Sequence, residues 1–317
     1  MSKTCFRIGT RGSPLALTQA NWVKNRLTER HPGLEVELRI IKTQGDKIQD
    51  VPLAQVGGKG LFVKEIEEAL LTREVDLAVH SMKDMPGELP PGLKIGAVPE
   101  REDPRDVFLS REPIRFEEVP LRGKIGTSSL RRKAQLLFQR PDLEVLSLRG
   151  NLDTRIRKME TLDLDGIILA AAGLHRLGLG ERIRHYLEPE FCLPAVGQGA
   201  LALEIRDPDP GTWEWIAFLH HEETSLCTRA ERAFLKRLEG GCQVPLAGQA
   251  RIAGDRLILT GLIAGLEGEA LFREQQAGPL SGPEALGAAL ADLLLQMGGR
   301  EILEKAYGFR GTPVNFE

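Results

Sequence analysis

Hydrophobic and polar positions in the first part of the chain follow the two periods that distinguish strands from helices. Residues 34–42 alternate between apolar and polar side chains, as a strand with one buried face does. Residues 6–10 form a shorter apolar run, and Ser13 followed by Pro14 gives a helix N-cap with proline at the first helical position. The pattern therefore predicts a strand, a helix to about residue 29 and a second strand.

This strand, helix, strand unit occurs a second time. Arg-Ile-Gly-Thr at residues 7–10 is matched by Lys-Ile-Gly-Thr at residues 124–127, and each is followed by a serine and a predicted helix. Residues 31–36 and 140–145 are similar to each other and lead into the second strand of each unit. Because strands that alternate with helices form parallel sheets covered on both faces, we expect two similar α/β lobes with parallel sheets.

The remaining pattern divides the chain into domains. Residues 99–105, rich in charge and proline, and residues 193–199 are the expected connections between the lobes, and a strand at 200–206 is a candidate to return to the first lobe. After residue 222 the pattern changes to that of a smaller domain, with a long helix predicted at 283–306. The expected domains are residues 1–99 with 200–217 for the first lobe, 105–193 for the second lobe, and 222–317 for a small α+β domain.

Charge narrows the classes of ligand. The 317 residues include 42 Lys and Arg and 45 Asp and Glu, for a formal net charge of -3, which argues against attraction to nucleic acid or acidic membranes. The arginines nevertheless cluster at 131–132 and within 149–157, so positive charge is concentrated locally. This pattern suits a small polyanionic ligand.

The cysteines and the N-terminus bear on the compartment. The four cysteines lie far apart, without a C-x-x-C pair or a Cys/His cluster at zinc spacing, so we expect neither a disulfide framework nor a metal site. The N-terminal segment, which contains Arg7 and Arg11, has no apolar stretch like the core of a signal peptide. No apolar run in the sequence approaches the ~18 residues of a membrane span. We therefore expect a protein of the reducing cytoplasm.

Asp84 is a candidate for catalysis. An apolar strand at residues 76–80 is followed closely by Lys83 and Asp84, and ligands of such folds bind beyond the carboxyl ends of the strands. An aspartate beside cations stays ionised, so it can accept a proton or stabilise a developing positive charge. The simpler interpretation of a lone aspartate is a turn in which it bonds nearby backbone amides.

A second candidate site lies at the start of the helix after residue 127. Thr127 and Ser129 supply hydroxyls, Arg131 and Arg132 supply guanidiniums, and a helix start offers free amides, so the segment could hold a carboxylate or a phosphate. Other arginines near predicted strand ends extend this surface: Arg149 and Arg155 from the second lobe, Arg11 from the first lobe, and Arg176 after a later strand.

Cys242 lies on a turn between Gly240, Gly241 and Pro245. Glycine leaves room for close approach, and the thiol does not occupy an apolar periodic face, which favours a presented thiol over a packed one. A nucleophile, a packed residue and an ordinary turn residue all remain possible interpretations of this pattern.

Together these segments resemble the porphobilinogen deaminase family, also called hydroxymethylbilane synthase, of tetrapyrrole biosynthesis. The resemblance spans nearly the whole chain in order, and its motifs are specific. The matching segments are residues 11–16 (RGSPLA), 57–62 (GGKGLF), 79–84 (VHSMKD), 126–132 (GTSSLRR), 148–151 (LRGN), 195–200 (AVGQGA) and 239–242 (EGGC). The resemblance implies two doubly wound lobes like type II periplasmic-binding-protein domains, a small α+β C-terminal domain, and a monomer.

The resemblance also implies an activity and a cofactor. Four porphobilinogen molecules would be joined head to tail with loss of ammonia, and water would release the linear tetrapyrrole hydroxymethylbilane. The implied cofactor is dipyrromethane, bound through a thioether to Cys242, which would then be an anchor and not a nucleophile. Asp84 would stabilise the positive charge on the pyrrole nitrogen. The implied cofactor-binding residues are Cys242, Lys83, Asp84, Thr127, Ser129, Arg131 and Arg132. The implied substrate-binding residues are Arg11, Ser13, Phe62, Arg149, Arg155 and Arg176, with Lys59 beside Phe62 in a lid or stacking element.

Two other classes of protein fit parts of the pattern. A two-lobed solute-binding protein would use the same architecture with the arginines as a carboxylate clamp, although no secretion signal is recognised in the sequence. A transferase with a cysteine nucleophile is disfavoured because no histidine lies at a recognisable partner position. An added mass of two pyrrole units on Cys242 would distinguish the deaminase from both.

Overall fold

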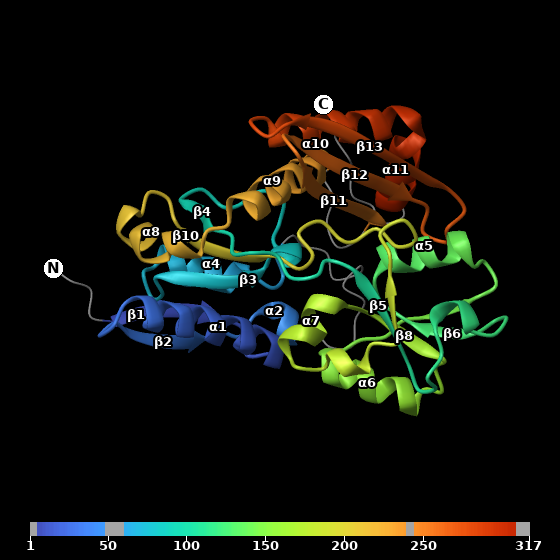
Figure 1. Cartoon of the computed structure of the whole chain (residues 1–317), viewed down its shortest axis with the longest axis horizontal. Coiled ribbons are helices and arrows are strands. Elements are labelled where there is room, and N and C mark those ends of the chain that lie inside the picture. Colours follow the sequence, from blue (N-terminus) through green and yellow to red (C-terminus); the bar gives the residue numbers. More distant parts are fainter. Residues whose placement is uncertain (1–4, 48–59, 239–243, 309–317) are drawn as a thin grey trace.

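The computed structural model of this chain describes residues 5–47, 60–238 and 244–308, and it contains three sheets with their helices (Figure 1). Lys59 and Cys242, both named by the sequence analysis, lie outside the described residues. Two five-stranded sheets form separate α/β lobes, and a three-stranded sheet forms a C-terminal domain.

The first lobe is built on a sheet in the order β2-β1-β3-β10-β4. Its strands are β1 (Cys5–Thr10), β2 (Glu35–Ile40), β3 (Leu77–Ser81), β4 (Leu93–Ala97) and β10 (Leu201–Arg206). Its helices are α1 (Pro14–Arg30), α2 (Gln44–Lys47), α4 (Lys64–Leu71) and α8 (Pro210–Ile216). The expected start of α1 is confirmed, because Ser13 accepts a hydrogen bond from the Ala16 amide and Pro14 is the first helical residue. Phe6, Ile8 and Leu27 are fully buried between sheet and helix.

The second lobe repeats this plan with a sheet in the order β7-β6-β8-β5-β9. Its strands are β5 (Asp106–Ser110), β6 (Lys124–Gly126), β7 (Glu144–Leu146), β8 (Gly166–Ala170) and β9 (His185–Leu187). Its helices are α5 (Leu130–Gln139), α6 (Leu152–Thr161) and α7 (Ala171–Arg176). In each lobe the first strand of the repeated unit pairs in parallel with two neighbours, β1 with β2 and β3, and β6 with β7 and β8. The two lobes therefore share one topology, as the repeat predicted.

The expectation of parallel sheets was wrong for one central strand in each lobe. β10 pairs antiparallel with β3 and β4, and β5 pairs antiparallel with β8 and β9. A parallel neighbour needs a crossover that carries the chain back to the same end of the sheet. β5 and β10 instead enter directly from the segments that connect the lobes. The expected return of residues 200–206 to the first lobe is confirmed.

The C-terminal domain packs helices against an antiparallel sheet of β11 (Leu246–Ala253), β12 (Arg256–Ala264) and β13 (Leu271–Pro279). Its helices are α9 (Glu222–Arg237), α10 (Pro283–Leu294) and α11 (Arg300–Gly308). The single helix predicted at 283–306 was wrong, because a wider turn at Leu295–Gly299 separates α10 from α11. Gly298 has φ of 116° there, a conformation that interrupts an α-helix and that glycine tolerates.

The two segments that connect the lobes are fastened to the C-terminal domain. Arg101, in the first segment, donates from Nη1 to Glu231 Oε1 on α9 at 2.6 Å and from Nε to the Gln198 carbonyl of the second segment at 2.7 Å. Glu231 is fully buried and also accepts from the amides of Gly197 and Ala250. Both connections therefore run alongside α9. No helix within the described ranges is long and apolar enough to cross a bilayer.

Candidate active site

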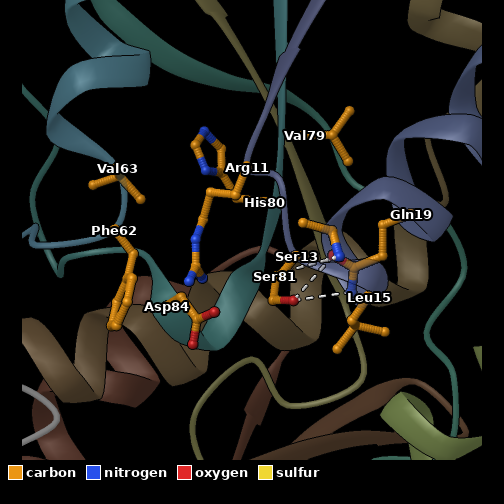
Figure 2. Close-up of a pocket in the computed structure, with 11 residues that line it drawn as sticks. Arg11, Ser13, Leu15, Gln19, Phe62, Val63, Val79, His80, Ser81 and Asp84 are labelled. Carbon is orange, nitrogen blue, oxygen red and sulfur yellow. Dashed lines mark hydrogen bonds between the residues drawn. The ribbon is translucent and has the colours of Figure 1, made fainter. Parts of the chain in front are cut away.

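Asp84 ends a short 3₁₀ turn, η1 (Met82–Asp84), that follows β3 directly. Figure 2 shows its carboxylate in a pocket with Arg11, Ser13 and Phe62. The pocket floor is the end of β3, where Ser81 exchanges hydrogen bonds with Gln19 of α1. The strand end thus places Asp84 where the sequence analysis expected ligand binding.

Arg11 is held in place by a carboxylate that the sequence analysis did not identify. Its Nε donates to Asp46 Oδ1 at 3.1 Å, and the ring of Phe62 lies 4.2 Å from its guanidinium carbon. The Thr43 hydroxyl donates to Asp46 Oδ2 at 2.8 Å. Burial opposes ionisation of Asp46, but hydrogen bonds from Arg11 and Thr43 lower its pKa. Asp46 therefore holds one edge of the Arg11 guanidinium, and the Phe62 ring packs against one of its faces.

Arg131 and Arg132 of the second lobe share one buried carboxylate, Asp106 at the start of β5. Arg131 Nη1 lies 2.6 Å from Asp106 Oδ2, and Arg132 Nη2 lies 2.6 Å from Asp106 Oδ1. The carboxylate is fully buried, and each arginine side chain is only 6% exposed. Burial would raise the pKa of Asp106, but the two guanidiniums lower it far below its usual range.

Gln198 of the connecting segment and Cys192, just before it, complete this cluster. Gln198 Nε2 donates to Asp106 Oδ1 at 2.9 Å, and Cys192 Sγ lies 3.4 Å from Asp106 Oδ2. Burial, reinforced by the charge of Asp106, raises the pKa of Cys192 to about 12, so its thiol stays protonated. Asp106 therefore joins the second lobe to the segment that leads back to the first.

Lys83 of the first lobe lies within electrostatic range of this cluster. Burial lowers the pKa of its ammonium to about 8; Asp84 and Asp106 oppose that shift, while Arg131 and Arg132 add to it. Lys83 therefore experiences charges on both lobes at once. The sequence motifs had grouped it with Arg131 and Arg132 although they are far apart along the chain.

Arg155 of α6 faces the same region from the second lobe. Burial lowers its pKa to about 10, Arg132 and Arg149 contribute to the shift, and Asp84 opposes it. Arg155 Nε donates to the Gly150 carbonyl at 2.9 Å, which fixes the base of its guanidinium. Asp84 of the first lobe thus interacts electrostatically with a cation of the second lobe.

Thr127 and Ser129 keep donors available at the start of α5. Thr127 Oγ1 accepts from the Ser129 amide at 3.2 Å, and Ser129 Oγ caps the helix by accepting from the Arg132 amide at 3.4 Å. Each hydroxyl is an acceptor in these bonds, so its own proton remains free to be donated to an anion.

Arg176 has a different environment. Its Nη2 donates to the Gly199 carbonyl at 2.7 Å, in the segment between the lobes. Burial lowers its pKa, and nearby Glu102, whose carboxylate accepts from His175 Nδ1 at 3.1 Å, opposes that shift. The structure therefore ties Arg176 to the connecting segment, while Arg155 faces Asp84.

The cations outnumber the carboxylates around Asp84. Among the described residues whose charges act on one another there, five are basic and two are acidic, so positive charge is in excess when all are ionised. The basic residues are Lys83, Arg131, Arg132, Arg149 and Arg155, and the acidic residues are Asp84 and Asp106. Such a surplus fits a ligand with several carboxylates. No group of His, Cys, Asp or Glu in the described ranges could hold a metal ion.

Comparison with known proteins covers most of the chain. Residues 6–214 match the family model "Porphobilinogen deaminase, dipyromethane cofactor binding domain", and residues 225–296 match "Porphobilinogen deaminase, C-terminal domain". The porphobilinogen deaminase of Pelobacter propionicus is 58% identical over 302 residues, covering 95% of this chain and 97% of that protein. The porphobilinogen deaminase of Syntrophotalea carbinolica is 57% identical over 314 residues, covering 99% of each.

Among solved structures, similar chains include two solute-binding proteins. A TRAP periplasmic solute binding protein from Desulfovibrio salexigens is 12% identical, with a TM-score of 0.42 over 70% of this chain and 74% of that one. An ancestral cationic amino acid solute binding protein is 13% identical, with a TM-score of 0.41 over 68% of this chain and 88% of that one. The family models and the curated relatives, which extend over both lobes and the C-terminal domain, decide the assignment: this chain belongs to the porphobilinogen deaminase family.

Proposed function

We propose that this chain deaminates porphobilinogen and condenses four molecules of it head to tail on a dipyrromethane primer bound to Cys242, then releases hydroxymethylbilane by hydrolysis. One observation carries the proposal: Asp84 lies in the first-lobe pocket with Arg11 and Ser13, and it interacts electrostatically with Lys83 and the second-lobe cation Arg155. A single carboxylate amid a surplus of cations suits a reaction in which a polycarboxylate substrate develops positive charge at one atom.

Asp84 acts on the pyrrole ring of the incoming substrate. As the carbon–nitrogen bond of its aminomethyl group breaks and ammonia leaves, positive charge develops on the pyrrole nitrogen. The Asp84 carboxylate accepts a hydrogen bond from that N–H and stabilises the charge, while Arg155 and Lys83 supply positive charge for the carboxylates of the substrate. The same carboxylate serves each of the four additions. A different ring reacts each time, but the positive charge always develops on a pyrrole nitrogen.

Residues around the shared Asp106 cluster hold the primer. When bound, dipyrromethane supplies the free pyrrole α-carbon that forms the new bond. Its acetate and propionate groups are matched by charged donors from both lobes and by two hydroxyls, which the proposal assigns as Lys83, Thr127, Ser129, Arg131 and Arg132, with Asp84 on the ring nitrogens. The charge surplus of the cleft supports this assignment.

The substrate and the growing chain contact the outer part of the cleft. Arg11, fixed by Asp46, binds a carboxylate of the arriving porphobilinogen beside Ser13 and the ring of Phe62. The proposal places Arg149, Arg155 and Arg176 along the path of the growing chain, where each binds carboxylates at a different length of product.

The proposed organisation follows the sequence boundaries: residues 1–99 with 200–217, 105–193, and 222–317. We also propose that the protein acts as a monomer, with no membrane or nucleic-acid partner, in the reducing cytoplasm. The described thiols of Cys5, Cys192 and Cys227 are unpaired, which agrees with that compartment.

Intact-protein mass and one substitution test the function. The purified chain should carry the added mass of two pyrrole units, and peptide mapping should locate it at Cys242. Asp84→Asn should leave this mass in place and lower kcat by about 10² or more, since it removes a charge needed only as positive charge develops. Asp207→Asn, at an exposed ion pair with Lys94 in the same lobe, is the control and should retain wild-type turnover. An unmodified chain, or an Asp84→Asn variant with most of its activity, would contradict the proposal.

A further inference from the structure

Helix α9 has one set of contacts within its own domain and another with the first lobe. Arg229 Nε lies 2.6 Å from Glu284 Oε1 on α10, in an exposed ion pair. Arg232, one turn later, contacts the first lobe, where its Nη2 donates to the Gly87 carbonyl at 3.3 Å. In Figure 1, α9 lies between the sheet of the first lobe and the rest of the C-terminal domain. The helix therefore joins the two.

The first-lobe segment that α9 contacts begins immediately after Asp84. A Cβ built on Gly87 would lie 3.3 Å from the Cα of Lys236, closer than an ordinary van der Waals contact, so the helix backbone approaches this segment closely. Lys236 Nζ also lies 2.7 Å from Glu88 Oε1, although both side chains are exposed. Only two residues lie between Asp84 and Gly87, so a shift of α9 would be transmitted to the catalytic carboxylate through a short length of chain.

A buried group of polar side chains lies behind the same contact. His80 Nε2 on β3 lies 3.0 Å from Glu204 Oε2 on β10, with side-chain exposures of 3% and 0%. Burial lowers the pKa of Arg232 on α9, and the nearby Glu204 opposes that shift. Arg232 Nη1 and Glu204 Oε1 are both buried, and neither has a hydrogen-bond partner among the described residues. Glu67 of α4 borders the group and interacts electrostatically with Glu204 and His80.

These buried side chains lie on three elements whose relative position the proposed reaction depends on. His80 lies four residues before Asp84 on the same strand and turn, Glu204 lies on the neighbouring strand, and Arg232 lies on the helix of the C-terminal domain. Removing one member of a buried charge group leaves the others without compensation, so the group resists displacement of any member. In sequence, α9 ends five residues before Cys242.

We propose that Arg232 and Glu204 are positioning residues that fix α9, and with it the origin of the cofactor-bearing turn, relative to Asp84. This inference rests on the proposed function, because it assumes that Cys242 anchors the primer and that Asp84 is catalytic. Neither residue touches the reacting atoms. Arg232 and Glu204 instead set the distance between the anchored end of the growing chain and the Asp84 carboxylate. A change in that distance lowers kcat more than it raises KM.

A double-mutant cycle on the holoenzyme tests the proposal. Arg232→Met and Glu204→Gln should each lower kcat about 10-fold or more, and leave the KM for porphobilinogen within about 2-fold. The kcat of the double variant should be no lower than that of the less active single variant, because both changes break the same linkage. Enzyme-bound intermediates, counted by intact mass at limiting substrate, should accumulate at early lengths.

The control is Arg229→Met on the same helix, which removes the exposed pair with Glu284 and should keep wild-type kcat and intermediates. Equal behaviour of Arg232→Met and Arg229→Met in an active enzyme with its normal adduct would overturn the inference. So would multiplicative losses in the double variant, or a raised KM with unchanged kcat. If the two-pyrrole adduct on Cys242 were absent and the Asp84→Asn variant were active, the proposed function itself would be contradicted.

Gly87→Ala keeps the test decisive if Arg232→Met does not fold. The added methyl group would press on the α9 backbone at 3.3 Å and shift it relative to Asp84 without changing any charge. The same fall in kcat with unchanged KM would support the inference, and wild-type kcat with a normal distribution of intermediates would contradict it.

Discussion

Replacing Asp106 by asparagine probes the buried cluster on which the cofactor-binding arginines depend. Its carboxylate accepts from Arg131 Nη1 at 2.6 Å, from Arg132 Nε and Nη2 at 3.0 and 2.6 Å, and from Gln198 Nε2 at 2.9 Å. Asparagine has the same shape, but it has no negative charge, and one of its two acceptor positions becomes a donor. Asp106→Asn therefore leaves two buried guanidiniums without a counter-charge.

The expected loss in the free energy of unfolding is about 3 to 5 kcal/mol, the usual effect of removing one partner of a buried ion pair. Domain stabilities are about 5 to 15 kcal/mol, so the change is large. It also has a pH signature. Because the folded-state pKa of Asp106 is lowered, its stabilisation is present above the unfolded pKa of about 4 and is lost as the pH falls below it. The variant should lack that part of the acid sensitivity.

Urea unfolding followed by circular dichroism, from pH 3 to pH 8, measures both effects. Asp163→Asn, at an exposed ion pair with Arg111 in the same lobe, is the control and should change the free energy of unfolding by less than about 0.5 kcal/mol. If Asp106→Asn were no more destabilising than Asp163→Asn at pH 7, the two arginines would not depend on this carboxylate, and the argument for a pre-formed anion site would fail.

Two further predictions concern substrate and ligand carboxylates. Asp46→Asn releases the guanidinium of Arg11 and should raise the KM for porphobilinogen about 10-fold. Glu37→Gln, at an exposed ion pair with Arg39 in the same lobe, is the control and should leave the KM unchanged. A lower KM in Asp46→Asn would contradict this prediction and show that Asp46 competes with substrate for Arg11. Lys83 has a pKa lowered to about 8 by burial, so its charge is lost as the pH rises through 8. Equilibrium binding of a carboxylate ligand should therefore weaken from pH 7 to pH 9 in wild type but not in Lys83→Met, and a pH-independent affinity in wild type would exclude this role.

The local elements could be predicted because their causes are local. Ser13 and Pro14 specify a helix start through one hydrogen bond and one fixed dihedral angle, and the alternation at 34–42 specifies a strand with one buried face. The break at Gly298 was missed because a glycine inside an apolar helical pattern does not by itself specify a positive φ. The direction of β5 and β10 was also missed, because it depends on where the connecting segments enter each sheet.

Part of the site could also be predicted. Asp84 follows an apolar strand, and a strand of this kind ends at the ligand-binding edge of the sheet, so its position was expected from sequence. Its partners were not expected. Asp46 and Asp106 have no distinctive spacing relative to Arg11 and Arg131, and the pairs meet only across 35 and 25 residues of chain.

By itself, the sequence determined the order of strands and helices, the repeated lobe, the concentration of arginines and the family motifs. These depend on neighbouring residues and on composition. Only the tertiary structure decided which carboxylate holds which arginine and how α9 contacts the segment after Asp84. Ion pairing depends on distance and burial, and folding brings together residues such as His80 and Glu204, 124 positions apart, in an interior where an uncompensated charge is costly.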